Sequence, residues 1–143
     1  KDSLGHIALL VQNKSVEIKT SFKSKKTKIF GNRNHLVNVF TNILDNAIKY
    51  SKENPIIKIK TLNDDKSTYV EIEDKGIGMN DDTLKMIFEK FFRQQNGDVH
   101  NIKGHGLGLA YVKKIVSLHN GKISVESTEG QGTKFKIQFP LFI

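Results

Sequence analysis

The sequence predicts a single α+β domain in which helices cover one face of a mostly antiparallel sheet. Its 143 residues, of which 37% are hydrophobic, are enough for one domain with a buried core. Stretches of alternating apolar and polar residues are joined in pairs by short turns, which indicates antiparallel hairpins. Between them lie stretches whose apolar residues repeat at helical spacing, which indicates helices that pack on a sheet.

The strands are expected in three parts of the chain. Residues 15–22 (SVEIKTSF) alternate as a half-buried strand does, and 27–31 (TKIFG) should form a short strand that ends in a glycine turn. Residues 56–62 and 68–74 should form two strands joined by the turn NDDK. The final hairpin, GKISVEST followed by TKFKIQFP, is joined by EGQG at 129–132.

Helices are expected in four segments, and the strongest signal lies at residues 34–51. One face of that segment carries Leu36, Phe40, Ile43, Leu44, Ala47 and Ile48. Asn32 or Asn34 should cap it, and Asp81 should cap the helix DDTLKMIFEKFF. Residues 107–119 should form another helix, and residues 2–12 should form the end of a longer one. The polar, glycine-containing residues 93–105 should form a loop.

The composition narrows the classes of function. Cysteine is absent, which excludes disulfides and cysteine metal sites and favours a reducing compartment. The net charge of +8 suggests an anionic partner, although solubility explains it equally well. The lysines are scattered apart from FKSKKTK at 22–28, so nucleic-acid binding is a minor alternative.

Asparagines form a polar stripe on the longest predicted helix. At about 100° of rotation per residue, one side of the helix carries Asn38, Asn42, Asn46 and Lys49, with Tyr50 at its edge. Asparagine is a poor helix former, so its repetition needs a reason. The stripe is either a solvated polar face or a row of oxygen ligands suited to Mg²⁺, with Lys49 offering a positive charge to phosphate.

The first of two glycine clusters, EDKGIGM at 73–79, follows a predicted strand. Asp74, Gly76 and Gly78 fit an ordinary β-turn. They also fit a base-binding site, because a carboxylate only accepts hydrogen bonds and can accept from the amino group of adenine.

The second cluster contains Gly104, Gly106 and Gly108 and precedes a predicted helix. The unpaired N–H groups and the partial positive charge at a helix start make an anion site, which glycines allow a phosphate to approach. The cluster is no Walker loop because GKS/T is absent, and its spacing is wrong for a dinucleotide fingerprint. A flexible hinge is the alternative.

Taken together in this order, the motifs make the sequence resemble the catalytic, ATP-binding domain of a bacterial sensor histidine kinase. The matching motifs are NILDNAIKYS (42–51), DKGIGM (74–79), IFEKFFR (87–93), GHGLGL (104–109) and the closing GTKFKIQFP (132–140). The resemblance covers about residues 15–140. Such kinase domains belong to a superfamily that also contains gyrase, a heat-shock chaperone and a mismatch-repair ATPase. It implies a two-layer α/β sandwich of about five strands under about three helices, with a mobile ATP lid at 93–105.

The resemblance also implies that ATP and Mg²⁺ are the ligands. Asn46 should coordinate the metal, with Asn42 beside it on the same stripe. Lys49 should contact phosphate, and Tyr50 should border the nucleotide. Asp74 should accept a hydrogen bond from the adenine amino group.

The two glycine clusters, which are the first (74–79) and second (104–109) glycine boxes of the family, are implied to complete the nucleotide site. Gly76, Ile77 and Gly78 should shape the base pocket, where Thr133 adds a contact, directly or through water. Backbone near the phosphates should come from Gly104, His105, Gly106, Leu107, Gly108 and Leu109.

The motif IFEKFFR (87–93), the phenylalanine box of the family, is implied to border the lid. Arg93 is the residue expected to meet the γ-phosphate or its transition state, and Lys103 is a second candidate. Phe92 should border the nucleotide, although Phe88, Phe91 and Phe92 all fit ordinary packing of a short helix under the lid as well.

Asn42 favours one reaction within the superfamily. Hydrolysing relatives resemble one another in carrying a water-activating glutamate at this position, and an amide is no general base at neutral pH. We therefore expect phosphate transfer to a protein histidine, with Asn42 and Arg93 as catalytic residues. The alternatives are an ATPase conformational switch and a regulatory serine kinase of the same superfamily.

No histidine has the sequence context of a phosphoacceptor, which is typically followed by an acidic residue and a proline. The five are His6, His35, His100, His105 and His119. We therefore expect the acceptor on a separate upstream dimerisation domain. Residues 1–13 should be the end of its hairpin helix or a linker, and 14–143 the catalytic domain.

The resemblance implies further partners beyond this chain. They are the upstream domain and a response-regulator receiver domain, with no nucleic acid and no direct membrane contact by this domain. The whole protein is expected to be a homodimer. This domain should lie in the cytoplasm, as part of a membrane-anchored sensor.

Overall fold

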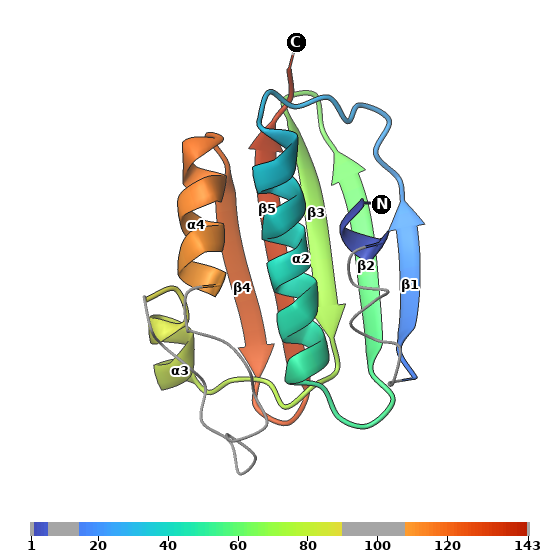
Figure 1. Ribbon diagram of the computed structural model, residues 1–143, viewed down its shortest axis with the longest axis vertical. Helices are drawn as coiled ribbons and strands as arrows, with labels where there is room; N and C mark the ends of the chain where they lie inside the picture. Colours follow the sequence, from blue (N-terminus) through green and yellow to red (C-terminus); the bar gives the residue numbers. More distant parts are fainter. Residues whose placement is uncertain (1, 6–14, 90–107, 143) are drawn as a thin grey trace.

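The computed structural model describes residues 2–5, 15–89 and 108–142. The elements in chain order are β1 (Glu17–Phe22), α2 (Arg33–Lys49), β2 (Ile56–Asn63), β3 (Ser67–Asp74), α3 (Asp81–Met86), α4 (Gly108–Leu118), β4 (Lys122–Thr128) and β5 (Gly132–Pro140). Figure 1 shows α2 and α4 lying side by side over the sheet, with α3 near the lower end of α4.

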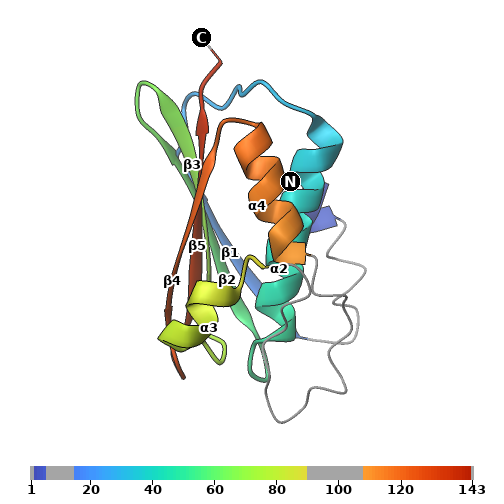
Figure 2. The same ribbon diagram turned by 90° about the vertical axis from the view of Figure 1, so that its left-hand side faces the viewer.

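The five strands form one sheet in the order β1-β2-β3-β5-β4. β1 pairs with β2 in parallel, and the other three pairings are antiparallel. Figure 2 shows the described helices gathered on one face of the sheet, and no described element covers the other face. The predicted two-layer α+β sandwich with a mixed, mostly antiparallel sheet is therefore confirmed.

Helix α2 follows the predicted apolar pattern closely. Its buried residues are Val39, Ile43, Leu44, Ala47 and Ile48. Leu36 and Phe40, which the pattern also places on this face, are partly buried against the same core. Asn32 caps the helix, since its side-chain oxygen accepts a hydrogen bond from the His35 N–H at 3.1 Å. Of the two predicted caps, Asn32 is therefore the one used.

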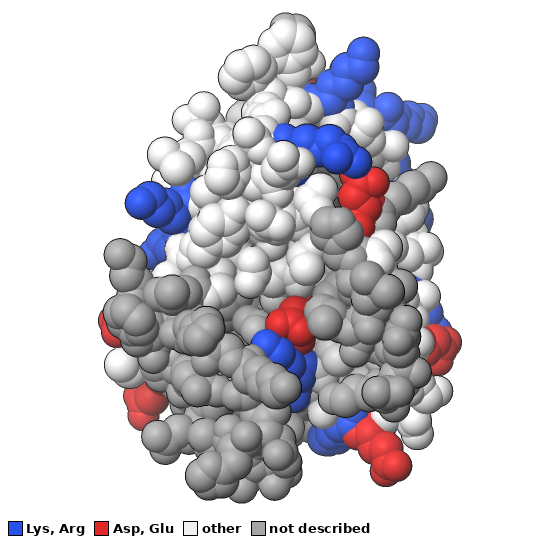
Figure 3. Space-filling view, viewed as in Figure 1, with Lys and Arg blue, Asp and Glu red and all other residues white. Residues whose placement is uncertain are grey.

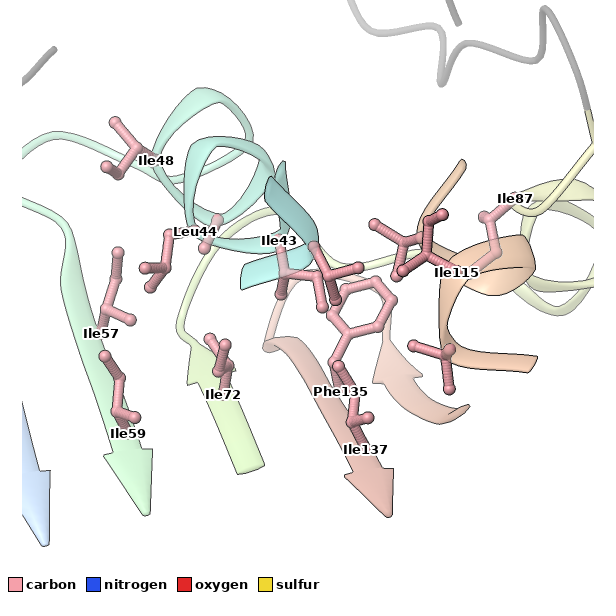
Figure 4. Close-up of a cluster of buried hydrophobic side chains, with 14 of the residues drawn as sticks. Ile43, Leu44, Ile48, Ile57, Ile59, Ile72, Ile87, Ile115, Phe135 and Ile137 are labelled. Carbon is pink, nitrogen blue, oxygen red and sulfur yellow. The ribbon is translucent and has the colours of Figure 1, made fainter. Parts of the chain in front are cut away.

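The core lies between α2, α4 and the covered face of the sheet. Figure 4 shows Ile43 and Leu44 pointing toward side chains of the strands below them, with Ile48 at the side of α2. The labelled strand residues are Ile57, Ile59, Ile72, Phe135 and Ile137, all of which are buried. Burial of such side chains contributes about 1.5–3 kcal/mol each.

Two secondary-structure predictions are wrong. Residues 27–31 form no strand, although the Phe142 N–H donates to the Lys28 carbonyl at 2.8 Å. This stretch leads to α2, and Gly31 lies so close to His119 that a Cβ on Gly31 would stand 2.4 Å from His119 Cδ2. The chain is here a largely exposed connection to α2, in which only Ile29 is partly buried.

The second correction concerns the helix predicted from Asp81. Helix α3 ends at Met86, and the Glu89 N–H bonds the Met86 carbonyl, three residues back, as in a turn. Asn80 caps α3 in place of Asp81, because its side chain accepts from the Thr83 N–H at 2.8 Å.

The open face of the sheet is polar because its strands alternate. Opposite charges are cross-strand neighbours there, as in the row Lys58, Glu73, Lys134 and Glu126. Lys134 Nζ lies 3.5 Å from Glu126 Oε2. A face of this composition is stable in water without a covering layer.

At the N-terminus, residues 2–5 are helical and contact α2. Ser3 Oγ donates a hydrogen bond to the Val37 carbonyl at 3.0 Å, and Arg33 pairs with Asp2 at 2.6 Å. The rest of the helix predicted over 2–12 lies outside the described residues.

Basic side chains are dispersed over the described part of the helix-covered surface in Figure 3. They are separated by uncharged surface and by occasional acidic groups. Within the described ranges, no helix combines the length and the apolarity needed to cross a membrane.

Candidate functional site

A row of polar side chains crosses one end of the sheet. Asp74 on β3 lies opposite Thr133 on β5, which in turn lies opposite Ser127 on β4. Because side chains two residues apart share a face, Asp74 faces the helices together with Ile72. The next row on the same face, two residues further along each strand, is instead apolar and consists of Ile72, Phe135 and Val125.

The Asp74 carboxylate is buried, with 9% of the residue exposed. Burial raises its pKa to about 6, while hydrogen bonds from the backbone N–H groups of Gly76 and Thr133 oppose this shift. The Gly76 N–H bonds Asp74 Oδ1 at 2.8 Å. At neutral pH the Asp74 side chain is thus largely ionised. Its carboxylate is then a strong hydrogen-bond acceptor for a donor group on a bound ligand.

The loop after Asp74 lies between the end of α2 and the β4–β5 turn and contacts both. The Ile77 N–H donates to the Tyr50 carbonyl at 3.0 Å, and the Ile77 carbonyl accepts from the Gly130 N–H at 2.7 Å. A Cβ on Gly76 would stand 2.4 Å from the Tyr50 carbonyl oxygen. Glycine is therefore required at Gly76 by contact with the protein's own backbone.

Gly78 is also required by close contact with the backbone, and in addition it has a left-handed backbone conformation that favours glycine. Its φ is +65°, and a Cβ there would stand 2.1 Å from the Thr128 carbonyl oxygen. Gly132, across the hairpin, has φ +123° and would place a Cβ 2.1 Å from the Asp74 carbonyl oxygen. These glycines let β3, its following loop and the β4–β5 turn close around Asp74.

Asn42, in the asparagine stripe of α2, lies beside the start of α4. Asn42 Nδ2 donates to the Asn38 carbonyl at 2.8 Å, which assigns the orientation of the amide. Asn42 Oδ1 then lies beside Gly108, where a Cβ would stand 2.9 Å from it. Asn46, one turn further along, is half-buried. The first residue of α4 is therefore a glycine that makes room for the Asn42 amide oxygen.

The last turn of α2 adds charge. Lys49 Nζ pairs with Asp45 Oδ2 at 2.8 Å, and both side chains are less than one-third exposed. Tyr50 is the C-cap residue of the helix, and its N–H bonds the Asn46 carbonyl at 3.0 Å. Lys49 is held by a carboxylate on its own helix, one turn before it.

Together these contacts place most predicted site residues at one end of the sandwich. Asn42, Asn46, Lys49 and Tyr50 come from α2, Asp74, Gly76, Ile77 and Gly78 from β3 and its loop, Gly108 and Leu109 from α4, and Thr133 from β5. The Gly76–Tyr50 and Gly108–Asn42 approaches link these elements directly. In Figure 1 this is the lower end of the molecule, where α2 ends and α4 begins.

The remaining predicted residues lie outside the described part of the chain. They are Phe92, Arg93, Lys103, Gly104, His105, Gly106 and Leu107, together with Phe91 and the lid at 93–105. Phe88 is described and packs against the core, and Lys113 Nζ lies 5.5 Å from the centroid of its ring. This contact fits the packing interpretation of Phe88.

Sequence reasoning missed two residues. Asp45, the partner of Lys49, is a predictable neighbour because the two are four residues apart on one helix. Ser127 follows Ile123 and Val125 in strict alternation, which places it on the covered face of β4. That alternation was visible in the sequence, but nothing local indicated that Ser127 would stand beside Thr133.

The family is established by comparison. Residues 31–143 match the family of histidine kinase-, DNA gyrase B- and HSP90-like ATPases, and the chain belongs to that family. Within it, the sensor protein RprX of Bacteroides fragilis is 41% identical over 136 residues, which is 94% of this chain and 26% of RprX. The signal transduction histidine-protein kinase ArlS of Staphylococcus aureus is 37% identical over 84% of this chain and 27% of ArlS.

A solved structure supports the same assignment. The mycobacterial sensor histidine kinase MprB superposes with a TM-score of 0.84 at 26% identity, over 97% of this chain and 91% of that chain. The resemblance drawn from the sequence motifs is thereby confirmed. This chain spans about a quarter of the length of the curated relatives that it matches.

Proposed function

We propose that this chain binds Mg-ATP at the described end of the sandwich and donates the γ-phosphate to a histidine on a separate dimerisation domain. The observation that carries the proposal is the buried Asp74 carboxylate, surrounded by glycine backbone and facing the same end as Asn42 and Asn46. Membership of an ATPase family supports a nucleotide as the ligand.

The adenine is assigned to Asp74. The carboxylate accepts from the exocyclic amino group, and its burial strengthens that bond by excluding water. Gly76, Ile77 and Gly78 shape the wall of the base pocket through their contacts with Tyr50 and the β4–β5 turn. Thr133, next to Asp74, contributes a hydroxyl to the same pocket.

The donor chemistry of α2 fits a magnesium ion. The Asn42 amide oxygen is turned toward α4 because its nitrogen is held by the Asn38 carbonyl. The described residues contain no cluster of three or more carboxylates or imidazoles that could hold a metal. Mg²⁺ bound with phosphates commonly uses one or two protein oxygens and several waters. Asn46 is assigned as the ligand because it matches the metal-binding asparagine of the family motif, with Asn42 one turn before it on the same helix.

The transfer step depends on positioning and charge. When bound, Mg²⁺ supplies charge neutralisation at the phosphate oxygens. Lys49 exchanges its bond with Asp45 for a phosphate oxygen, and backbone N–H groups of residues 104–109 contact the same phosphates. Arg93, with Lys103 as second candidate, stabilises the charge that develops on the transferred group.

Asn42 favours phosphotransfer over hydrolysis. An amide cannot take a proton from water, so ATP is preserved until a histidine nucleophile reaches the γ-phosphate. The names of the relatives, a sensor protein and two histidine kinases, favour this function over an ATPase switch or a regulatory serine kinase.

The assignment extends to the whole protein. Residues 14–143 form the catalytic domain, and 1–13 end an upstream dimerisation hairpin or form a linker. The protein is a homodimeric, membrane-anchored sensor with this domain in the cytoplasm. It passes its phosphate to the receiver domain of a response regulator.

Calorimetric titration with a non-hydrolysable ATP analogue and Mg²⁺ tests the site. Wild-type protein should bind, Asp74→Asn should lose binding, and Asn46→Asp should lose the Mg²⁺ dependence. Equal binding by wild type and Asp74→Asn would contradict the adenine assignment. Steady ATP hydrolysis by the isolated domain would favour the switch instead.

A further inference from the structure

The Ser127 hydroxyl lies at the centre of a hydrogen-bond network behind the proposed adenine pocket. Its oxygen accepts from the Met79 N–H at 2.8 Å, in the loop that follows Asp74. The same hydroxyl donates to the Gly132 carbonyl at 2.9 Å, and its oxygen lies 2.8 Å from Thr133 Oγ1. Ser127 therefore joins the loop of the first glycine box to the start of β5.

Counting the hydrogens restricts how this network can be arranged. Each hydroxyl carries one hydrogen, and the Gly132 carbonyl only accepts. If Ser127 donates to Gly132, the short contact with Thr133 requires Thr133 to donate to Ser127. If Ser127 donates to Thr133 instead, the Thr133 hydrogen is directed elsewhere. The first is the arrangement of the free protein, and only the second leaves Thr133 able to donate into the pocket, so recognition of a base there requires the Ser127 hydrogen to move from Gly132 to Thr133.

The two arrangements differ in what they offer to a base. The hydrogen-bonding edge of adenine presents an amino donor beside the ring nitrogen N1, which is an acceptor. Asp74 supplies an acceptor for the amino group, and a donor is needed for N1. Thr133 lies next to Asp74 in the same row of the sheet and supplies that donor, directly or through one water, only when Ser127 donates to it.

We propose that Ser127 is a positioning residue that orients the Thr133 hydroxyl and thereby sets recognition of adenine N1. This inference rests on the proposed function, because it takes the nucleotide to be bound at Asp74. Ser127 itself does not contact the base. It acts through Thr133 and through the Met79 N–H, which fixes the loop that carries Gly76 and Gly78.

Ser127 is suited to this role by its place in the strand. It is half-buried on the covered face of β4, directly opposite Thr133 in the antiparallel register. Ser124, on the same strand, is exposed on the opposite face, where it pairs with Lys136. Ser124 is therefore a matched control for removing a serine hydroxyl from β4.

The experiment compares ADP with 1-deaza-ADP, in which a carbon replaces N1, so that no turnover complicates the titration. Dissociation constants are measured by calorimetry for wild type, Ser127→Ala, Ser127→Thr and Ser124→Ala. Wild type and Ser124→Ala should prefer ADP by about fivefold to tenfold, as one net hydrogen bond supplies. Ser127→Ala should retain less than about a twofold preference, and Ser127→Thr, which keeps the hydroxyl, should restore it.

The outcomes separate this inference from the proposed function. If Asp74→Asn binds ADP as wild type does, the adenine site is wrong and the role of Ser127 with it. If Asp74→Asn fails to bind but Ser127→Ala still discriminates like wild type, the inference alone is wrong. The inference also fails if Ser127→Ala weakens both nucleotides equally and lowers the melting temperature of the free protein, because Ser127 is then only structural.

Discussion

Two neighbouring rows of the sheet, on the same strands and the same face, have opposite chemistry. Ile72, Phe135 and Val125 form an apolar row under the helices, whereas Asp74, Thr133 and Ser127 form a polar row at the end of the sheet. The apolar row contributes stability by burial. The polar row places a buried carboxylate and two hydroxyls where further burial of apolar groups was possible. A function explains that choice better than stability does.

The largest effect on stability is expected in the apolar row. Phe135 is 5% exposed and lies among the labelled core side chains of Figure 4. Phe135→Ala should lower the free energy of unfolding by about 3–5 kcal/mol, because it removes the ring and leaves a cavity. Denaturant unfolding followed by circular dichroism measures this loss.

The comparison requires that this loss be confined to stability. At a temperature where Phe135→Ala is still folded, it should bind the ATP analogue within a few-fold of wild type. A folded variant that has lost binding would show that the two rows do not divide stability from function.

For Asp74→Asn we expect the opposite of Phe135→Ala, namely a loss of nucleotide binding without a loss of stability. The amide can still accept, but it also donates and carries no charge, so nucleotide binding should weaken by about a hundredfold or more. The free protein should be as stable as wild type or more so, because a buried charge has been removed. Parallel titrations and melts of the two proteins measure both quantities.

The pH dependence of stability isolates the charge of Asp74. Its pKa is raised to about 6 in the folded protein, from 3.8 as the ordinary value, chiefly by burial. At pH values between these two, Asp74 is protonated more often in the folded state than in the unfolded state, so its contribution to stability falls as pH rises. The loss is about 2–3 kcal/mol between pH 4 and 6, and Asp74→Asn should lack it. Carboxylates with a lowered pKa, such as Asp64, contribute in the opposite direction, so the difference between the wild-type and Asp74→Asn curves is the quantity to measure. Parallel curves for the two proteins would contradict the buried-charge account.

Much of the fold was predictable because its signals are local. Helix α2 follows from apolar spacing, and the two hairpins follow from alternation interrupted by turns. The error at residues 27–31 has the opposite cause. A short apolar stretch does not say whether a neighbouring strand exists to pair with it, and here Phe30 is 84% exposed.

The site residues likewise divide into those that local motifs predicted and one that they did not. Asp74, Asn42 and the glycines were recognisable as motifs within short segments. Ser127 was not, since its partner Met79 is 48 residues away and the two meet only because the strand order places β5 between β3 and β4. Long-range register is the information that a local pattern lacks.

A smaller effect is expected behind the polar row, where two glycines with positive φ can be compared. Gly78→Ala combines a left-handed conformation with a Cβ 2.1 Å from the Thr128 carbonyl oxygen, whereas Gly130 has φ +81° and open space around its Cβ. Gly78→Ala should lose more than about 2 kcal/mol of stability, and Gly130→Ala about 1 kcal/mol. Thermal melts of both variants measure the difference. Equal losses would show that the loop yields easily and does not hold Asp74 in place.

The smallest effect is expected on the open face. Glu126 lies on β4 one residue before Ser127, but it faces solvent and lies 3.5 Å from Lys134. Exposed ion pairs contribute at most about 1 kcal/mol, so Glu126→Gln should change stability by less than that and should leave ADP binding unchanged. Urea unfolding and one titration check both. Weakened binding would mean that the open face communicates with the pocket, and the contrast between the two rows would no longer be confined to the covered face.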